Sequence, residues 1–137
     1  MIDVLMRIGF ILFLPSFILW VSINIYLSIK FRKKRYKMIN GMCESAPEQV
    51  KERARLIFES NFSWVFASSF LYTWYGYMML RFAWKISRKK IINWRKSIKK
   101  NYGKHGKTYV VFSNIVNISM LGFFILISSL ALEYVIR

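Results

Sequence analysis

Residues 81–107 read RFAWKISRKKIINWRKSIKKNYGKHGK, and this stretch decides how the rest of the chain can be arranged. It holds eleven lysines and arginines in 27 residues and no acidic residue. Apolar segments lie on both sides of it, and Trp84, Trp94 and Tyr102 stand among the charges. A basic segment between apolar runs is typical of a cytoplasmic loop at a membrane surface. The stretch therefore predicts an integral membrane protein.

The composition of the whole chain favours the same class. The 137 residues are 55% hydrophobic and carry a formal charge of +16, and the two kinds of residue are segregated into separate blocks. This length predicts a single membrane domain over residues 1–137. A basic balance also suits nucleic acid. Nucleic-acid-binding proteins rarely contain an apolar run as long as Ile8–Ile29, so we expect no nucleic-acid partner.

Two segments have the length and composition of membrane-spanning helices. Ile8–Ile29 is almost wholly apolar, and its 22 residues are enough to cross a hydrocarbon core of about 30 Å. It is too long for the apolar core of a signal peptide, and no small-residue cleavage site follows it, so we expect an uncleaved anchor. Val110–Leu132 is the second predicted span. The predicted fold class is an all-α, multi-pass integral membrane protein.

Three asparagines lie inside the two predicted spans. An amide is costly in lipid, so Asn24 is expected to face another helix or to lie near the headgroups. Asn114 and Asn117 are three residues apart and share a helix face. All three are candidate helix–helix contacts, and a shallow position in contact with water is the alternative.

The segment Phe62–Trp84 has the length of a third span, but ten of its 23 residues are aromatic. Serine, threonine and glycine residues dilute its hydrophobicity, and tryptophan and tyrosine prefer the headgroup boundary to the bilayer centre. The segment is therefore predicted either to span the membrane or to form a re-entrant or in-plane helix.

Two basic loops, residues 30–61 and 85–109, flank this aromatic segment. Lys30–Lys37 carries six positive charges in eight residues, which marks this end of the first span as cytoplasmic. Ser45-Ala-Pro-Glu48 resembles a capping box and predicts the start of a short surface helix. In Arg88–Asn101 the apolar residues recur every three or four positions, which predicts an amphipathic helix on anionic lipid. The residues expected at the lipid headgroups are Lys33, Arg35, Arg88, Lys89, Lys90, Trp94, Arg95 and Lys99.

The charges of the two loops conflict with three simple spans. Residues 30–61 hold nine lysines and arginines against four acids, and residues 85–109 hold ten and no acid. The positive-inside bias places both loops in the cytoplasm. That requires two full spans, with both termini outside and the aromatic segment dipping in and returning. Three spans with the N-terminus inside would instead expose Lys30–Lys37 outside, and charge alone favours the two-span arrangement.

The chain lacks the residues that most enzymes and metal sites need. It has one histidine, His105, one cysteine, Cys43, and six acidic residues, too few for a zinc or iron ligand set. No Ser/His/Asp set and no phosphate-binding glycine loop is present. Neither clear span contains an internal acidic or basic residue, which argues against an ion pathway. We expect no enzymatic activity, no metal and no cofactor.

Residues 75–100, YGYMMLRFAWKISRKKIINWRKSIKK, together with the apolar span that follows them, resemble the small immunity proteins of pore-forming colicins. The resemblance covers about half of the chain. It implies a short, basic, three-spanning protein of the bacterial inner membrane that blocks one toxin by helix contacts within the bilayer. The first basic loop is longer and more basic here, and the topology of that family would place Lys30–Lys37 outside the cytoplasm.

Three functions remain open at the level of the sequence. The first is an immunity or exclusion factor that contacts a membrane-inserting toxin or a phage protein, with membrane lipids and another membrane protein as partners. The second is a membrane-perturbing protein of holin or toxin type. The third is an accessory subunit of a larger membrane complex.

Overall fold

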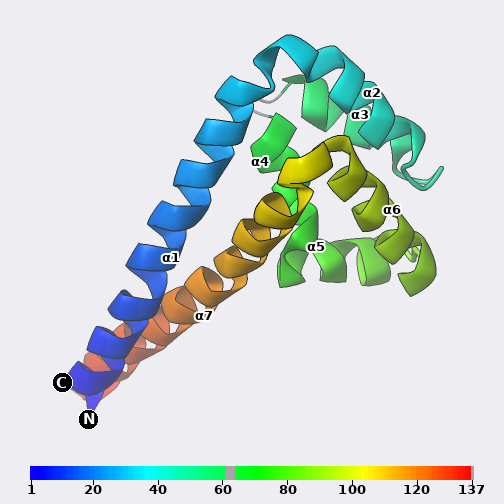
Figure 1. Cartoon of the computed structure of the whole chain (residues 1–137). Coiled ribbons are helices and arrows are strands. Elements are labelled where there is room, and N and C mark those ends of the chain that lie inside the picture. The colour runs from blue at the N-terminus through cyan, green and yellow to red at the C-terminus, as the bar shows by residue number, and fades with distance from the viewer. Residues whose placement is uncertain (61–63, 137) are drawn as a thin grey trace.

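A computed structural model of the chain describes residues 1–60 and 64–136, and the secondary structure of these residues is entirely helical. Two long helices, α1 (Ile2–Lys30) and α7 (Gly106–Ile136), run side by side in opposite directions (Figure 1). Both ends of the chain therefore lie at one tip, and the shorter helices gather at the other end. We call the pair α1 and α7 the arm, and residues 31–105 the head.

The two arm helices are long enough and apolar enough to cross a membrane. Only 11% of the most apolar stretch of α1, and 28% of that in residues 103–136, is buried within the chain. The core helix of a soluble protein would be mostly buried, whereas large apolar side chains such as Ile11, Ile18 and Phe124 are exposed on the arm. The prediction of an all-α chain with two long apolar helices is confirmed.

Small residues line the contact between the two arm helices. A Cβ atom on Gly122 would lie 2.6 Å from the backbone nitrogen of Phe13 and 2.7 Å from the carbonyl oxygen of Gly9. These distances leave no room for a side chain, so the two backbones touch at this point. The hydroxyl of Ser119 also donates across the arm to the carbonyl of Phe13, at 3.2 Å. Close backbone approach of this kind is typical of helices that pair in membranes.

The helix α6 (Arg88–Asn101) packs against other helices of the head and against α7, and it has the bounds that the sequence predicts. Its apolar stripe, Ile91, Trp94 and Ile98, is buried. The indole N–H of Trp94 donates to the carbonyl of Met42 in α2 (Arg35–Glu44), at 2.9 Å. The amphipathic helix is therefore confirmed, but its apolar face packs on protein and not on lipid.

Ser45-Ala-Pro-Glu48 does not open a helix, so the predicted capping box is wrong. The next helix, α3 (Lys51–Ser60), does not begin until three residues after Glu48. The hydroxyl of Ser45 donates backward to the carbonyl of Gly41, at 3.1 Å, inside α2. Ser45 therefore satisfies a carbonyl at the end of the preceding helix, and does not cap the start of the next one.

The aromatic segment is not one continuous helix. Residues 62 and 63 lie outside the described part, and the remainder consists of α4 (Trp64–Ser69), η2 (Phe70–Tyr72), α5 (Trp74–Met78) and a π-helical turn, η3 (Met79–Ala83). Thr73 interrupts the helices with an extended backbone, at a ψ of 154°. Its hydroxyl accepts a hydrogen bond from the N–H of Gly76, at 2.9 Å, and so caps α5.

The helix α4 lies between the two arm helices where the arm meets the head (Figure 1). The indole of Trp20 in α1 donates to the hydroxyl of Ser69 in α4, at 3.2 Å. The hydroxyl of Ser68 accepts a hydrogen bond from Tyr109 of α7, at 2.8 Å, and lies 2.9 Å from the hydroxyl of Tyr102. These hydrogen bonds attach the aromatic segment to both arm helices.

Candidate membrane-interface site

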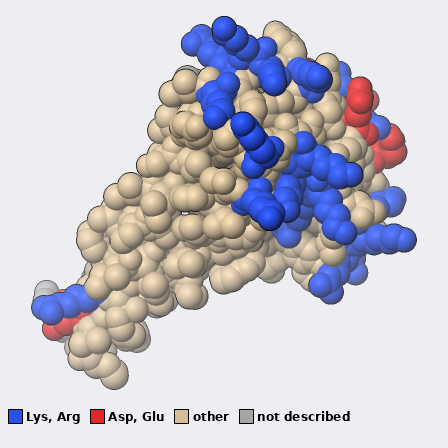
Figure 2. All heavy atoms as spheres, in the orientation of Figure 1, with Lys and Arg blue, Asp and Glu red and all other residues tan. Residues whose placement is uncertain are grey.

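Nearly all of the positive charge lies at one end of the molecule. Of the 22 lysines and arginines, all except Arg7 and Arg137 fall in residues 30–107, which leaves 20 at or beside the head. Figure 2 shows these side chains over the head, whereas the arm between the head and the tip carries none on this face. The fold therefore brings the two basic loops together on the same side of the apolar arm.

The residues predicted to meet lipid headgroups fall into two groups. Trp94 is buried and Arg35 and Arg95 are half-buried, so the sequence overestimates how much of the basic face is exposed. The residues of the set that are exposed on the head are Lys33, Arg88, Lys89, Lys90 and Lys99.

Arg95 joins α6 to the aromatic segment. Its Nε atom donates to the carbonyl of Leu71, at 2.8 Å, and its guanidinium lies 5.4 Å from the ring centres of Tyr72 and Tyr77. The hydroxyl of Tyr72 donates in return to the carbonyl of Arg95, at 2.5 Å. Burial lowers the pKa of Arg95, and the two tyrosines partly oppose this effect. The side chain therefore has a structural role in the head.

Asn117 binds the backbone on both sides of the interruption in the aromatic segment. Its side-chain oxygen accepts a hydrogen bond from the N–H of Trp74, at 2.9 Å. Its side-chain nitrogen donates to the carbonyl of Tyr72, at 3.3 Å. These two backbone groups flank Thr73, where the helical hydrogen bonds stop. Asn117 is buried and forms a contact between α7 and the aromatic segment.

The other two asparagines donate hydrogen bonds within their own helices. Asn114 is exposed and donates to the carbonyl of Val110, at 2.9 Å. Asn24 is buried in α1 and donates to the carbonyl of Trp20, at 2.7 Å. A spacing of three residues separates Asn114 and Asn117 by about 60° around the helix axis. That rotation is enough for one amide to reach the aromatic segment while the other stays on the surface.

Beyond Thr73 the aromatic segment presents an apolar outer face. Trp74, Tyr75, Met78, Met79 and Phe82 are all exposed, and their spacing keeps them on one side of α5 and η3. An exposed row of large apolar and aromatic side chains is a candidate surface for contact with lipid.

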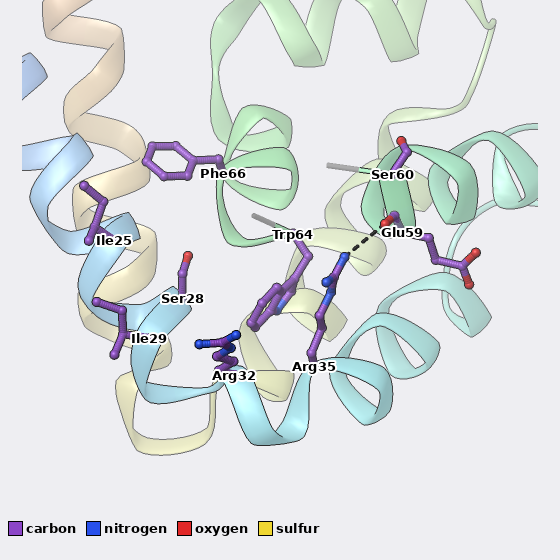
Figure 3. A pocket seen from close by; sticks show the side chains of 9 residues that line it. All are labelled: Ile25, Ser28, Ile29, Arg32, Arg35, Glu59, Ser60, Trp64 and Phe66. Carbon is purple, nitrogen blue, oxygen red and sulfur yellow. Dashed lines mark hydrogen bonds between the residues drawn. The ribbon is translucent and has the colours of Figure 1, made fainter. Parts of the chain in front are cut away.

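A groove of about 560 Å³ opens between α1, the end of α3 and the start of α4, with residues of η1 (Arg32–Lys34) and α2 at one end (Figure 3). Its apolar side is formed by Ile25, Ile29 and Phe66, and Arg32 and Arg35 lie at its other end. The sequence alone did not single out this groove. The only local signal is the position of Arg32, two residues after the end of the apolar helix α1.

The chain offers few groups for reactive chemistry. Cys43 is buried in the head, and burial raises the pKa of its thiol. Within residues 1–60 and 64–136, no three histidine, cysteine or acidic side chains gather in a group that could hold a metal ion.

Comparison with known proteins gives no match among family models, curated proteins or solved structures. The function must therefore be inferred from the residues and their geometry.

Proposed function

We propose that the protein is a two-span protein of the bacterial inner membrane, with the arm in the bilayer and the head on the cytoplasmic surface. The observation that carries this proposal is the outward exposure of the apolar side chains of the arm. Between Arg7 and Lys30, α1 has 22 apolar or uncharged residues, which extend about 33 Å as a helix. This matches a hydrocarbon core of about 30 Å. The basic head on one side agrees with the positive-inside bias.

In this placement the aromatic segment is re-entrant. Ser69 is hydrogen-bonded to Trp20, which lies ten residues, or about 15 Å of helix, from Lys30 at the head end of α1. Asn117 lies at a similar distance from Lys107. Non-helical backbone is tolerated at such a depth only where protein groups satisfy its hydrogen bonds. Asn117 supplies these bonds at the interruption, which supports a segment that dips in and returns.

We propose further that the protein acts by contacts with another membrane protein within the bilayer and catalyses no reaction. A shallow apolar groove on the arm supports this proposal, because a helix of a partner can pack into it. The groove is lined by Phe13, Phe17, Val116, Ser119, Met120, Phe123 and Phe124. An immunity or exclusion factor, which must contact a membrane-inserting toxin or phage protein, acts in this way.

Site-specific photo-cross-linking tests this function. A photoreactive phenylalanine analogue replaces Phe17, inside the groove of the arm, or Ile18, which is exposed on the same helix outside it. The proposal predicts a discrete protein adduct from position 17, in cells exposed to the toxin or phage, and none from position 18. The same protein adduct from both positions, or lipid adducts alone from both, contradicts it.

A further inference from the structure

We infer that the groove between α1, α3 and α4 binds one phospholipid with an anionic headgroup. The inference rests on the proposed function, because it requires the head end of α1 to lie at the headgroup level. Its volume of about 560 Å³ falls within the range of ligand sites in proteins, roughly 300–1,000 Å³. Its lining changes from apolar to basic along its length, as a phospholipid does (Figure 3).

The apolar part of the groove lies beside the last two turns of α1. Ile25 and Ile29 are one helical turn apart, and they are 47% and 71% exposed. Phe66 of α4 lies opposite them, and its ring forms the other wall (Figure 3). An acyl chain that enters between these walls lies parallel to α1, in the direction of the surrounding lipid chains.

The basic end of the groove is formed by two arginines. Arg32 is exposed, and its guanidinium forms no hydrogen bond or ion pair with any residue that the structure describes. Arg35 is held in place, because its guanidinium donates to the carbonyl of Glu59, at 2.9 Å, and lies 5.8 Å from the ring centre of Trp64. The carboxylate of Glu59 points away from Arg32 (Figure 3). A planar guanidinium can bind two oxygens of a phosphate at once.

Trp64 lines the groove between its apolar and its basic ends. The residue is only 3% exposed, and its indole N–H has no hydrogen-bond partner in the described part of the chain. A buried donor without an acceptor is unfavourable. The Nε1 atom itself has almost no accessible surface, so Trp64 contributes its ring to the wall of the groove, beside the guanidinium of Arg35.

Native mass spectrometry of the full chain in detergent tests the site, with phosphatidylglycerol and phosphatidylcholine added in equal amounts. The wild type should retain one phosphatidylglycerol in preference to phosphatidylcholine. Arg32→Gln should reduce this retention about fivefold, the effect expected for one cation near a headgroup. Lys34→Gln, which removes the same charge from an exposed neighbour outside the groove, should leave it unchanged.

A second pair of variants blocks the groove without a change of charge. Ile25→Trp fills the apolar part and should abolish retention, whereas Ile18→Trp, two turns earlier on α1 and outside the groove, should not. The inference is overturned if, in both pairs, the groove variant retains as much phosphatidylglycerol as its control variant. It is also overturned if the wild type retains phosphatidylglycerol and phosphatidylcholine equally. Either result leaves the proposed function intact, whereas absence of the wild-type chain from the membrane fraction refutes that function as well. Circular dichroism confirms that each variant is folded.

Discussion

Asn117→Leu is the substitution that most directly perturbs the link between the arm and the aromatic segment. It keeps the approximate size of the side chain but removes its two hydrogen bonds, to the N–H of Trp74 and to the carbonyl of Tyr72. Each buried group left without a partner costs about 1–3 kcal/mol. The added apolar burial offsets part of this, by about 1–2 kcal/mol. Two such groups cost about 2–6 kcal/mol together, so we expect a net loss of about 1–4 kcal/mol in the free energy of unfolding.

The matched control is Asn114→Leu, one turn earlier in the same helix. Asn114 is exposed and bonds only within α7, so its replacement should change the stability by less than about 0.5 kcal/mol. Unfolding is measured in detergent micelles by titration with sodium dodecyl sulfate, followed by near-ultraviolet circular dichroism. Hydrogen exchange should also accelerate over residues 70–83 in the Asn117 variant alone. Equal losses of stability in the two variants would refute the role assigned to Asn117.

Three further predictions test other parts of the fold. Gly122→Ala should destabilise the arm by about 1–3 kcal/mol in the same titration, because the Cβ of the new alanine would meet backbone atoms of α1. The control Leu121→Ala, on the exposed face of α7, should have a much smaller effect. Cys43 should react slowly with a maleimide in native lysed cells and rapidly after denaturation, because it is buried and burial raises the pKa of its thiol. Fast labelling of the native protein would show that the head is loosely packed. Strong expression should leave the membrane potential normal, as a dye that reports the potential can show, and its collapse would favour the holin or toxin alternative.

The elements predicted correctly are those that local patterns specify. An apolar run of more than 20 residues forms one helix wherever it lies, so α1 and α7 could be recognised from composition. The two ends of helix α6 could be predicted because Ile91, Trp94 and Ile98 recur at helical spacing. The same pattern does not say what covers the apolar face, and here α2 covers it where lipid was expected.

The interruption at Thr73 could not be predicted from its neighbours. It depends on Asn117, which is 43 residues from Trp74 in sequence and becomes a neighbour only when α7 packs against the aromatic segment. The sequence predicts Arg95 at the lipid headgroups and gives no sign of its contact with the aromatic segment, since its partner Leu71 is 24 residues away. Long-range hydrogen bonds of this kind leave no periodic signal in the sequence.

The close contact between α1 and α7 has a recognisable pattern of small residues in the sequence. Gly9 and Ser16 are seven residues apart, as are Gly122 and Ser129, and all four are buried in the structure. A spacing of seven residues is two helical turns, which places small residues on one face. This pattern could have identified the two faces that pair before the fold was known.

The central claim is that two spans place both termini on one side of the membrane and the basic head on the other. In a Cys43→Ala background, single cysteines replace Asp3, Tyr36 and Tyr134, which are all exposed. Positions 3 and 134 lie at the tip of the arm, and position 36 lies in the head (Figure 1). The test is labelling of spheroplasts with a membrane-impermeant maleimide, before and after lysis. The account predicts that positions 3 and 134 are labelled in intact spheroplasts and position 36 only after lysis. Labelling of positions 3 and 134 from opposite sides would contradict it and indicate three spans.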